Sequence, residues 1–333
     1  GYMGQQETIA SLERILAPDG RVDTSFSVVF LKGELAYKLK REIKTPFLDY
    51  STLEKRGLLC KREFQINSRH SPVLYRGLAS LCSGSGGIGP WRAGRTPPED
   101  AIEHLLEMNR FDEDALLSRL AMRGSLTEAL CGAVAAKVAH MHDAAPLVAS
   151  AGYAEKFLQV VHIIMGQFCA AVDGILPAEA LKEVPHRLQR AFDNCHDVLS
   201  ARGSTGNVRE CHGDLHLGNI CLYKGEPCIF DAVEFNTEFT HIDTLYDLSF
   251  LIMDLHHHSL PKLAENVAKG YLAGTRTPWA DYAAVMPLYL GLRAVIRCSI
   301  SAGSARGSQS PETADAQQRE ARHYLEEALA FLS

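Results

Sequence analysis

The residues best suited to chemistry lie in one short segment and a carboxylate beyond it. Residues 211–220 read Cys-His-Gly-Asp-Leu-His-Leu-Gly-Asn-Ile, and Asp231 follows Asn219 by twelve positions. Phosphoryl transfer from ATP needs a carboxylate that accepts the proton of the attacking hydroxyl, and oxygen ligands that hold magnesium against the phosphates. A loop with Gly218 before Asn219 can turn Asp214 and Asn219 into one space. We therefore expect Asp214 to act as the base, with Asn219 and Asp231 as magnesium ligands.

His212 completes the His-x-Asp-x-x-x-x-Asn arrangement found in protein kinases, and we expect it to brace the loop by hydrogen bonds. His212 and His216 are four apart, as in helical zinc sites, but Gly213 and Gly218 disfavour a helix here. The plainer alternative is a solvated turn in which Asp and Asn have ordinary turn roles. The position of Asp231 at the end of a predicted hairpin favours the catalytic interpretation.

A phosphate-binding lysine is expected on a strand upstream. Lys38 and Lys40 face the same side of the strand predicted at 35–39. We favour Lys38, because Ala36 precedes it by two positions, as in the kinase pattern. Glu63, on the following predicted helix, is the expected ion-pair partner. An exposed edge-strand lysine and an ordinary helix-surface glutamate are the alternatives.

No glycine-rich loop precedes this lysine, and no Walker-type Gly-x-x-x-x-Gly-Lys occurs. The expected position of the loop is occupied by Thr24-Ser25-Phe26-Ser27. Hydroxyl and backbone N–H groups at Ser25 and Ser27 are therefore candidate phosphate contacts.

Hydrophobic periodicity and turn residues predict the elements that must position these groups. A capping-box spacing at 51–54 opens the first helix, and a Gly/Ser/Pro-rich loop covers 83–98. Expected strands cover 26–31, 35–39, 101–108, 220–223 and 227–230, and expected helices cover 53–69, most of 112–199, 243–256, 261–272, 282–301 and 313–332. The fold class is therefore α+β, with a small β-rich N-lobe (1–108) and a larger, mainly helical C-lobe (109–333) that contains the second hairpin.

Composition restricts partners and compartment. The 34 basic and 40 acidic residues give a net charge of −6, which argues against a nucleic-acid surface. Nine scattered cysteines, an odd number without Cys-x-x-Cys, indicate a reducing cytoplasm. No basic segment followed by an apolar stretch opens the sequence, so we expect no signal peptide. The apolar segment 282–296 contains Pro287 and Arg293, which favours a buried helix over a membrane span.

The longer motifs resemble the aminoglycoside phosphotransferase / choline kinase superfamily. Gly213, between His and Asp, is typical of small-molecule kinases. Four stretches are similar to bacterial members of unassigned substrate, some of which carry a second, P-loop domain: Tyr37-Lys-Leu-Lys-Arg41, Pro46-Phe-Leu-Asp-Tyr50, Arg110-Phe-Asp and Phe230-Asp-Ala-Val-Glu-Phe-Asn236. The resemblance covers about residues 20 to 300. It implies a bilobal protein-kinase-like fold, ATP, Mg²⁺ and transfer of the γ-phosphate to a hydroxyl of a small molecule such as an aminoglycoside or amino sugar.

Two further hypotheses follow from the resemblance. Backbone groups near Glu107, Met108 and Asn109 are expected to pair with adenine, although Met108 also fits a core position. The residues expected to line the acceptor pocket are Glu234, Asn236, Asp243, Tyr289, Arg293 and Arg297. The two arginines recur at helical spacing, and bridging between helices is the alternative for both.

Three other functions remain open. The acceptor can be a Ser or Thr side chain of a protein, or the chain can be a nucleotide-binding regulator without turnover. A metal-binding protein would require the histidines to converge, and His256-His257-His258 is better explained as a solvated helix end. The motifs do not determine the acceptor or the oligomeric state.

Overall fold

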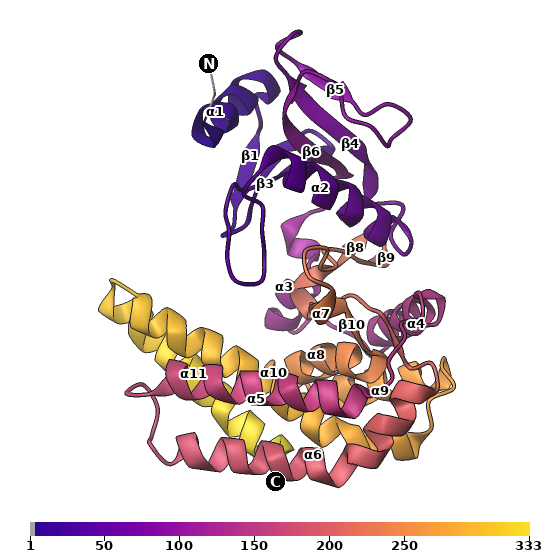
Figure 1. The fold of residues 1–333 in the computed structure, drawn as a ribbon, viewed down its shortest axis with the longest axis vertical. Helices are drawn as coiled ribbons and strands as arrows, with labels where there is room; N and C mark the ends of the chain where they lie inside the picture. Colours follow the sequence, from indigo (N-terminus) through magenta and orange to yellow (C-terminus); the bar gives the residue numbers. More distant parts are fainter. Residues whose placement is uncertain (1–3) are drawn as a thin grey trace. The chain divides into compact units, whose positions relative to one another are not determined.

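The computed structural model describes residues 4–333, which form two compact units (Figure 1). The first comprises residues up to 120 together with 218–240, and the second comprises 121–217 and 241–333. The first contains a mainly antiparallel sheet and the second is mainly helical, so the predicted α+β class is confirmed. The first unit extends past the predicted division at 108/109 and includes the segment that carries the second hairpin.

A six-stranded antiparallel sheet organises the first unit, in the order β1-β2-β3-β6-β4-β5. The predicted hairpin is present as β2 and β3, and Gly33, at φ 57°, allows its tight turn. The strands are β1 (Gly20–Asp23), β2 (Ser27–Lys32), β3 (Leu35–Lys40), β4 (Tyr75–Cys82), β5 (Ile88–Pro90) and β6 (Ala101–Asn109).

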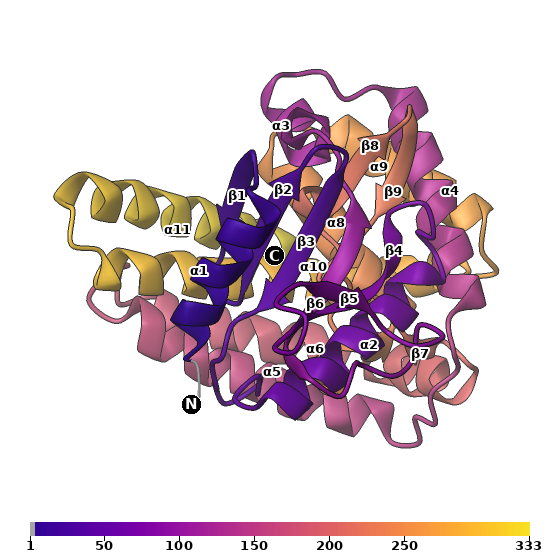
Figure 2. The same cartoon turned by 90° about the horizontal axis from the view of Figure 1, so that it is seen from above.

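Helices cover both faces of this sheet. Helix α1 (Gln5–Leu16) lies across β1 to β3 (Figure 2), where Ile9 and Leu12 pack with Val28, Phe30 and Leu39. Helix α2 (Leu53–Ser68) packs on the opposite face. Because side chains alternate along a strand, β3 directs Leu39 toward α1 and the side chains on either side of it toward α2.

The cap of α2 differs by one residue from the prediction. Thr52 is the N-cap, and its hydroxyl accepts a hydrogen bond from the N–H of Lys55 at 3.1 Å. Ser51 instead donates to Asp49 at 2.6 Å. Adjacent Ser and Thr are both good caps, so spacing alone cannot choose between them.

The second predicted hairpin is present as β8 (Ile220–Tyr223) and β9 (Glu226–Ile229). Its turn residues Lys224 and Gly225 have φ of 52° and 82°, which suits a tight two-residue hairpin turn. The prediction placed this hairpin inside the helical lobe. Cys221 and Cys228 instead pack in the same apolar cluster as residues of β3, β4 and β6.

The second unit consists mainly of helices, with α10 and α11 lying side by side (Figure 1). A two-stranded sheet pairs β7 with β10. The remaining elements of the chain are η1 (Glu113–Ala115), α3 (Leu117–Met122), α4 (Glu128–Ala144), α5 (Tyr153–Val172), α6 (Ala180–Ser204), β7 (Val208–Glu210), η2 (Leu217–Asn219), α7 (Thr237–Thr240), β10 (His241–Asp243), α8 (Thr244–His257), α9 (Pro261–Ala273), α10 (Trp279–Gly307) and α11 (Pro311–Phe331).

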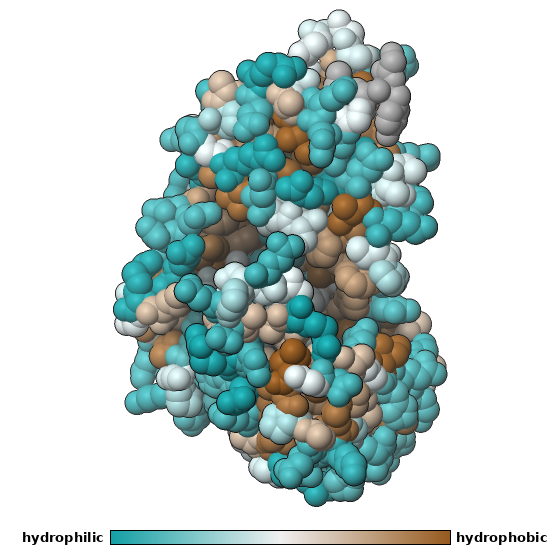
Figure 3. Space-filling view, turned by 90° about the vertical axis from the view of Figure 1, so that its left-hand side faces the viewer, coloured by the Kyte–Doolittle hydropathy of each residue, from teal (hydrophilic) through white to brown (hydrophobic). Residues whose placement is uncertain are grey.

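Helix α10 is long and apolar enough to cross a membrane, with a mean hydropathy of 1.4 over its most apolar window. However, 61% of that window is buried within the protein, as in a core helix. The helix extends beyond the predicted 282–301 at both ends. Figure 3 shows one face of the molecule, on which hydrophilic side chains predominate and apolar ones are scattered.

Candidate active site

The predicted ion pair between Lys38 and Glu63 is present in the first unit. Lys38 Nζ lies 3.0 Å from Glu63 Oε2 and 3.2 Å from Asp231 Oδ1. Burial lowers the pKa of Lys38, but the charges of Asp231 and Glu63 outweigh it and the net shift is upward. The lysine is therefore held as a cation beside the half-exposed carboxylate of Asp231.

Lys40 faces the same side of β3 but is held differently. Its Nζ lies 2.6 Å from Glu63 Oε1 and 2.6 Å from Glu234 Oε1, and only 3% of the side chain is exposed. The Tyr50 ring lies 4.9 Å from this ammonium, and the Tyr50 hydroxyl donates to Glu234. Both glutamates of Lys40 are buried, whereas Lys38 shares Glu63 with a more exposed partner. Lys38 is thus the more exposed of the two lysines, and its contact with phosphate stays a prediction.

The hairpin of β8 and β9 brings Asp231 close to Asn219 in the chain fold, as the predicted turn requires. The N–H of Phe230 donates to the carbonyl of Asn219 at 3.0 Å, so the next residue, Asp231, lies at the same end of the hairpin. Asp231 has φ 57°, an uncommon value for a residue with a side chain, and its N–H donates to Tyr75 Oη at 3.0 Å. Left-handed backbone of this kind concentrates at functional sites.

The predicted catalytic loop belongs to the second unit as far as Leu217, and the chain enters the first unit at Gly218. His212 Nδ1 accepts a hydrogen bond from the N–H of Asp214 at 3.1 Å, which is the expected bracing role. Gly213 has φ 89°, where a side chain would be strained, and this explains the glycine between His and Asp.

A buried carboxylate that sequence reasoning missed fixes the start of this loop. Asp247, in α8, accepts from the N–H groups of His212 and Gly213 at 3.1 and 2.9 Å. His142 Nε2 lies 2.7 Å from the same carboxylate. Burial raises the pKa of Asp247, but the His142 interaction outweighs it and brings the pKa to about 2. A second α8 carboxylate, Asp254, accepts from the N–H of Leu217 at 2.9 Å.

Asp214 itself pairs with an imidazole. His216 Nε2 lies 3.4 Å from Asp214 Oδ2. Burial raises the pKa of Asp214, but the hydrogen bond and charge of His216 outweigh it and the net shift is downward. The pKa of His216 is raised by the same partner, against its own burial. Asp214 is consequently ionised at neutral pH, as a proton acceptor must be.

The predicted phosphate contacts near β2 are used differently. The Ser27 hydroxyl lies 2.9 Å from the Thr24 hydroxyl, and the N–H of Ser27 donates to Thr24 Oγ1 at 3.0 Å. Ser27 is buried and Ser25 is exposed. Ser27 thus stabilises its own turn, and a phosphate role for either serine stays a prediction.

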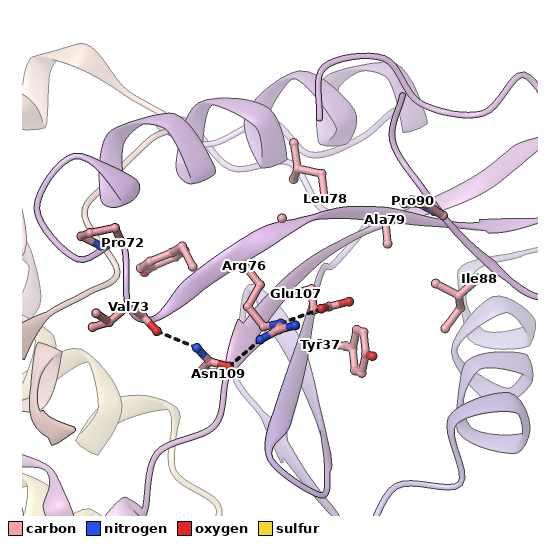
Figure 4. A pocket seen from close by; sticks show the side chains of 12 residues that line it. Tyr37, Pro72, Val73, Arg76, Leu78, Ala79, Ile88, Pro90, Glu107 and Asn109 are labelled. Atoms are coloured by element: carbon pink, nitrogen blue, oxygen red, sulfur yellow. Dashed lines mark hydrogen bonds and ion pairs between the residues drawn. The ribbon is translucent and has the colours of Figure 1, made fainter. Parts of the chain in front are cut away.

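The three residues predicted at adenine lie in β6, between β3 and β4. The side chains of Glu107 and Asn109 line a groove of ≈ 720 Å³ on the sheet, where both hydrogen bond with Arg76 (Figure 4). Met108 instead packs in the apolar cluster on the Lys38 face. The N–H of Asn109 already donates to Leu74 O at 2.8 Å, so adenine would need other backbone groups of this segment.

The predicted acceptor residues are divided between the two units. In the first unit, Glu234 is bound to Lys40 and Tyr50 as described above. Asn236 donates to the Phe47 carbonyl at 3.3 Å and accepts from the N–H of Glu238 at 2.9 Å, as a turn residue does.

In the second unit, Asp243 is fully buried rather than in a pocket wall. It binds Arg202 through both oxygens, at 2.9 and 2.8 Å, and accepts from the Tyr289 hydroxyl at 2.8 Å. Asp243 also caps α8 through the N–H of Leu245. The structure therefore gives Asp243 and Tyr289 a scaffolding role.

The two predicted acceptor arginines make contacts between helices, which is the alternative considered for both. Arg293 donates to the Tyr246 carbonyl at 2.9 Å, and its guanidinium lies 3.8 Å from the centroid of that ring. Arg297 lies over Tyr324 at 5.8 Å. They connect α10 to α8 and α11, respectively.

Comparison with known proteins supplies the context for this geometry. The model of the phosphotransferase enzyme family matches residues 90–288. Uncharacterized proteins of Mycobacterium bovis and Mycobacterium tuberculosis are 26% identical over 283 residues, which is 84% of this chain and 53% of theirs. The chain thus spans about half the length of these curated relatives.

Solved structures agree in fold. A choline/ethanolamine kinase family protein from Mesorhizobium loti has a TM-score of 0.52 at 15% identity, with 99% of each chain covered. A microcompartment-associated aminopropanol kinase has a TM-score of 0.54 at 16% identity, with 96% of each chain covered. At these identities the likeness establishes the kinase-like fold alone.

Proposed function

This chain belongs to the phosphotransferase enzyme family, and from that premise we propose that it transfers the γ-phosphate of ATP to a hydroxyl group of a small molecule. The observation that carries the proposal is the ion-pair chain Glu63–Lys38–Asp231, with distances of 3.0 and 3.2 Å. Two structures of similar fold contain a nucleotide: one aminoglycoside phosphotransferase is bound to ADP, and another is a complex with GDP. Lys38 is proposed to contact the phosphates, and Glu63 holds the lysine in place.

Asn219 and Asp231 are the proposed magnesium ligands. A carboxamide and a carboxylate supply the hard oxygen atoms that Mg²⁺ prefers, so the donor set fits the ion. When bound, the ion would neutralise charge on the phosphate oxygens. The hairpin register keeps both residues at one end of β8 and β9. The left-handed backbone of Asp231 sets the orientation of its side chain.

Asp214 is the proposed general base. Its lowered pKa leaves it ionised at neutral pH, and the bonds from Asp247 to the loop backbone hold the segment in one conformation. Because the loop is fixed before substrate binds, little reorganisation is needed in the reaction. Asp214 would take the proton from the acceptor hydroxyl as the oxygen attacks the γ-phosphorus and ADP leaves.

The acceptor is proposed to be a small hydroxylated molecule, such as an aminoglycoside or amino sugar. The named structural neighbours include a choline/ethanolamine kinase family protein and an aminopropanol kinase, which supports this class. We also propose that the protein acts in the cytoplasm, since none of the nine cysteines, all within the described residues, forms a disulfide.

The test is ATP consumption with Mg²⁺ over a panel of aminoglycosides, amino sugars, choline-like alcohols, nucleosides and proteins. We expect acceptor-dependent ADP release with a small molecule, and its loss in Asp214→Asn. Transfer to a protein alone would support the protein-kinase alternative. ATP binding without turnover on any acceptor would support a regulator and overturn the proposal.

A further inference from the structure

A second cluster of ionisable side chains lies in the second unit, at the C-terminal end of α8. His257, the penultimate histidine of the run 256–258, meets one face of α11. Glu320, His323 and Glu327 come from that face, at spacings of three and four residues. These spacings place side chains on one side of a helix. The histidine run is thus more than a solvated helix end.

Three of these side chains converge on one point. Glu327 Oε1 lies 3.0 Å from His257 Nδ1 and 2.8 Å from His323 Nε2. One donor atom from each of the three residues falls within 4.8 Å of the others. Tetrahedral ligands about 2.0–2.2 Å from a zinc ion lie about 3.3–3.6 Å apart. Only small adjustments of the three side chains are therefore needed, and the side chain of His323, 44% exposed, has room to make them.

The fourth residue orients the central imidazole. The other ring nitrogen of His257, Nε2, lies 2.5 Å from Glu320 Oε1. With Nε2–H donating to Glu320, Nδ1 is left as the lone-pair nitrogen that faces Glu327. Histidines that bind metals usually donate their second ring N–H to a carboxylate in this way. The Tyr324 ring, stacked on His257 at 3.8 Å and 6°, fixes the imidazole plane.

The donor chemistry selects the kind of ion. Two imidazole nitrogens and one carboxylate suit Zn²⁺ and similar transition metals, whereas Mg²⁺ and Ca²⁺ prefer oxygen ligands alone. We propose that His257, His323 and Glu327 form a zinc-class metal site that joins α8 to α11, with Glu320 orienting His257 and water completing the coordination. None of these four residues is among those proposed to bind ATP or magnesium.

The other histidine–carboxylate group of the second unit provides a contrast. His142, Cys211 and Asp247 also place donor atoms within 4.8 Å of one another. Both nitrogens of His142 are already bonded, to Tyr271 and Asp247, and Asp247 accepts from the loop backbone. All three side chains are buried. The α8–α11 cluster is partly exposed, because the side chains of Glu320 and His323 are each 44% exposed, and it is therefore accessible to an ion from solution.

Neighbouring charges do not prevent cation binding. Arg297 lies 5.8 Å from the Tyr324 ring, and His258 pairs with Asp254 at 3.7 Å. The carboxylates of Glu320 and Glu327 offset the positive charge of an entering ion. The competing state is a protonated His257 held between the same two carboxylates, and metal binding has to displace that proton.

The experiment is a titration of the metal-free chain of 333 residues with ZnCl₂ by calorimetry, and with CoCl₂ by visible absorption. We expect one zinc ion per chain, cobalt bands typical of four-coordination, and a Tm that rises with zinc. His323→Gln and Glu327→Gln should abolish all three signals. Glu320→Gln should weaken binding by about 10- to 100-fold, as expected for a residue that acts through a ligand.

Two matched variants serve as controls. His256→Gln removes a neighbouring histidine that packs on Phe331, and it should leave zinc binding unchanged. Asp231→Asn removes the other proposed divalent site and should also leave it unchanged. No zinc binding by the wild-type protein, or equal binding by His323→Gln, would overturn the proposal. Because His323 is partly exposed, its variant should fold, and circular dichroism verifies this.

Discussion

Two half-exposed carboxylates of the proposed active site, one from each unit, are held by different partners. Asp231 in the first unit is 38% exposed and pairs with the ammonium of Lys38. Asp214 in the second is 44% exposed and pairs with the imidazole of His216. A lysine stays charged over the whole physiological range, whereas a histidine does not. Asp231 therefore has a partner that keeps its charge, whereas the partner of Asp214 can lose its charge.

Substituting each carboxylate in turn is expected to have the largest effect. Asp214→Asn should retain ATP binding and lose about 10³- to 10⁴-fold in kcat, because it removes only the proton acceptor. Asp231→Asn should lose magnesium-dependent ATP binding as well. Calorimetry with ATP and Mg²⁺, alongside steady-state kinetics, separates the two. The control is Asp197→Asn, at a fully exposed position of α6. Near-normal turnover in Asp214→Asn would contradict the assignment of Asp214 as the base.

The two lysines of β3 sharpen the comparison within the first unit. Lys38→Met should lower kcat/KM by at least about 100-fold with little change in Tm, because Lys38 is proposed to contact phosphate. Lys40→Met should instead destabilise the fold by about 3–5 kcal/mol, because it leaves Glu234 buried without its cation and removes one of the two cations of Glu63. Urea unfolding and kinetics on both variants test this. Equal effects of the two substitutions on both measures would remove the distinction.

Replacing the imidazole tests the conditional partner. In His216→Gln the interaction that lowers the pKa of Asp214 is lost, so this pKa should rise. The acidic limb of the kcat/KM profile should then move to higher pH. In the wild-type protein, the raised pKa of His216 means that the pair adds stability below pH about 6.5 and loses it as pH rises through the folded-state pKa. An unshifted acidic limb would show that Asp214 does not set it.

The smallest expected effect concerns His104, a buried histidine of the first unit whose pKa is lowered, whereas the pKa of His216 is raised. Burial lowers the pKa of His104 to about 4, and its Nδ1 lies 2.8 Å from the Ser80 hydroxyl. The folded state favours neutral His104, so stability is complete above the unfolded pKa and falls as pH drops toward about 4. We expect a loss of about 2 kcal/mol between pH 7 and pH 5. His104→Asn should remove that part of the pH dependence in urea unfolding.

The elements that hold the site were largely predictable from local patterns. Both hairpins, helix α2 and the helices from α8 onward follow alternation, turn residues and helical periodicity. Helix α1 and the short strands β7 and β10 were missed, because three- or four-residue pairings and an isolated amphipathic segment give weak signals. Tyr50 lies in a recognised motif and Asp247 lies in a predicted helix, but no local pattern predicts that they bind Glu234 and the loop backbone at 212–213, respectively.

The sequence by itself determined the family, the α+β class and the chemical types in the loop 212–219, because these depend on residues close together in the chain. Only the tertiary structure distinguished the surroundings of Lys38 from those of Lys40. The partners that differ, Asp231 and Glu234, are more than 190 residues away from the lysines. The tertiary structure likewise showed that Asp243 is buried in the core and that His257 contacts α11. The strength of a charge pair depends on burial and on the second partner, and both are properties of packing rather than of spacing.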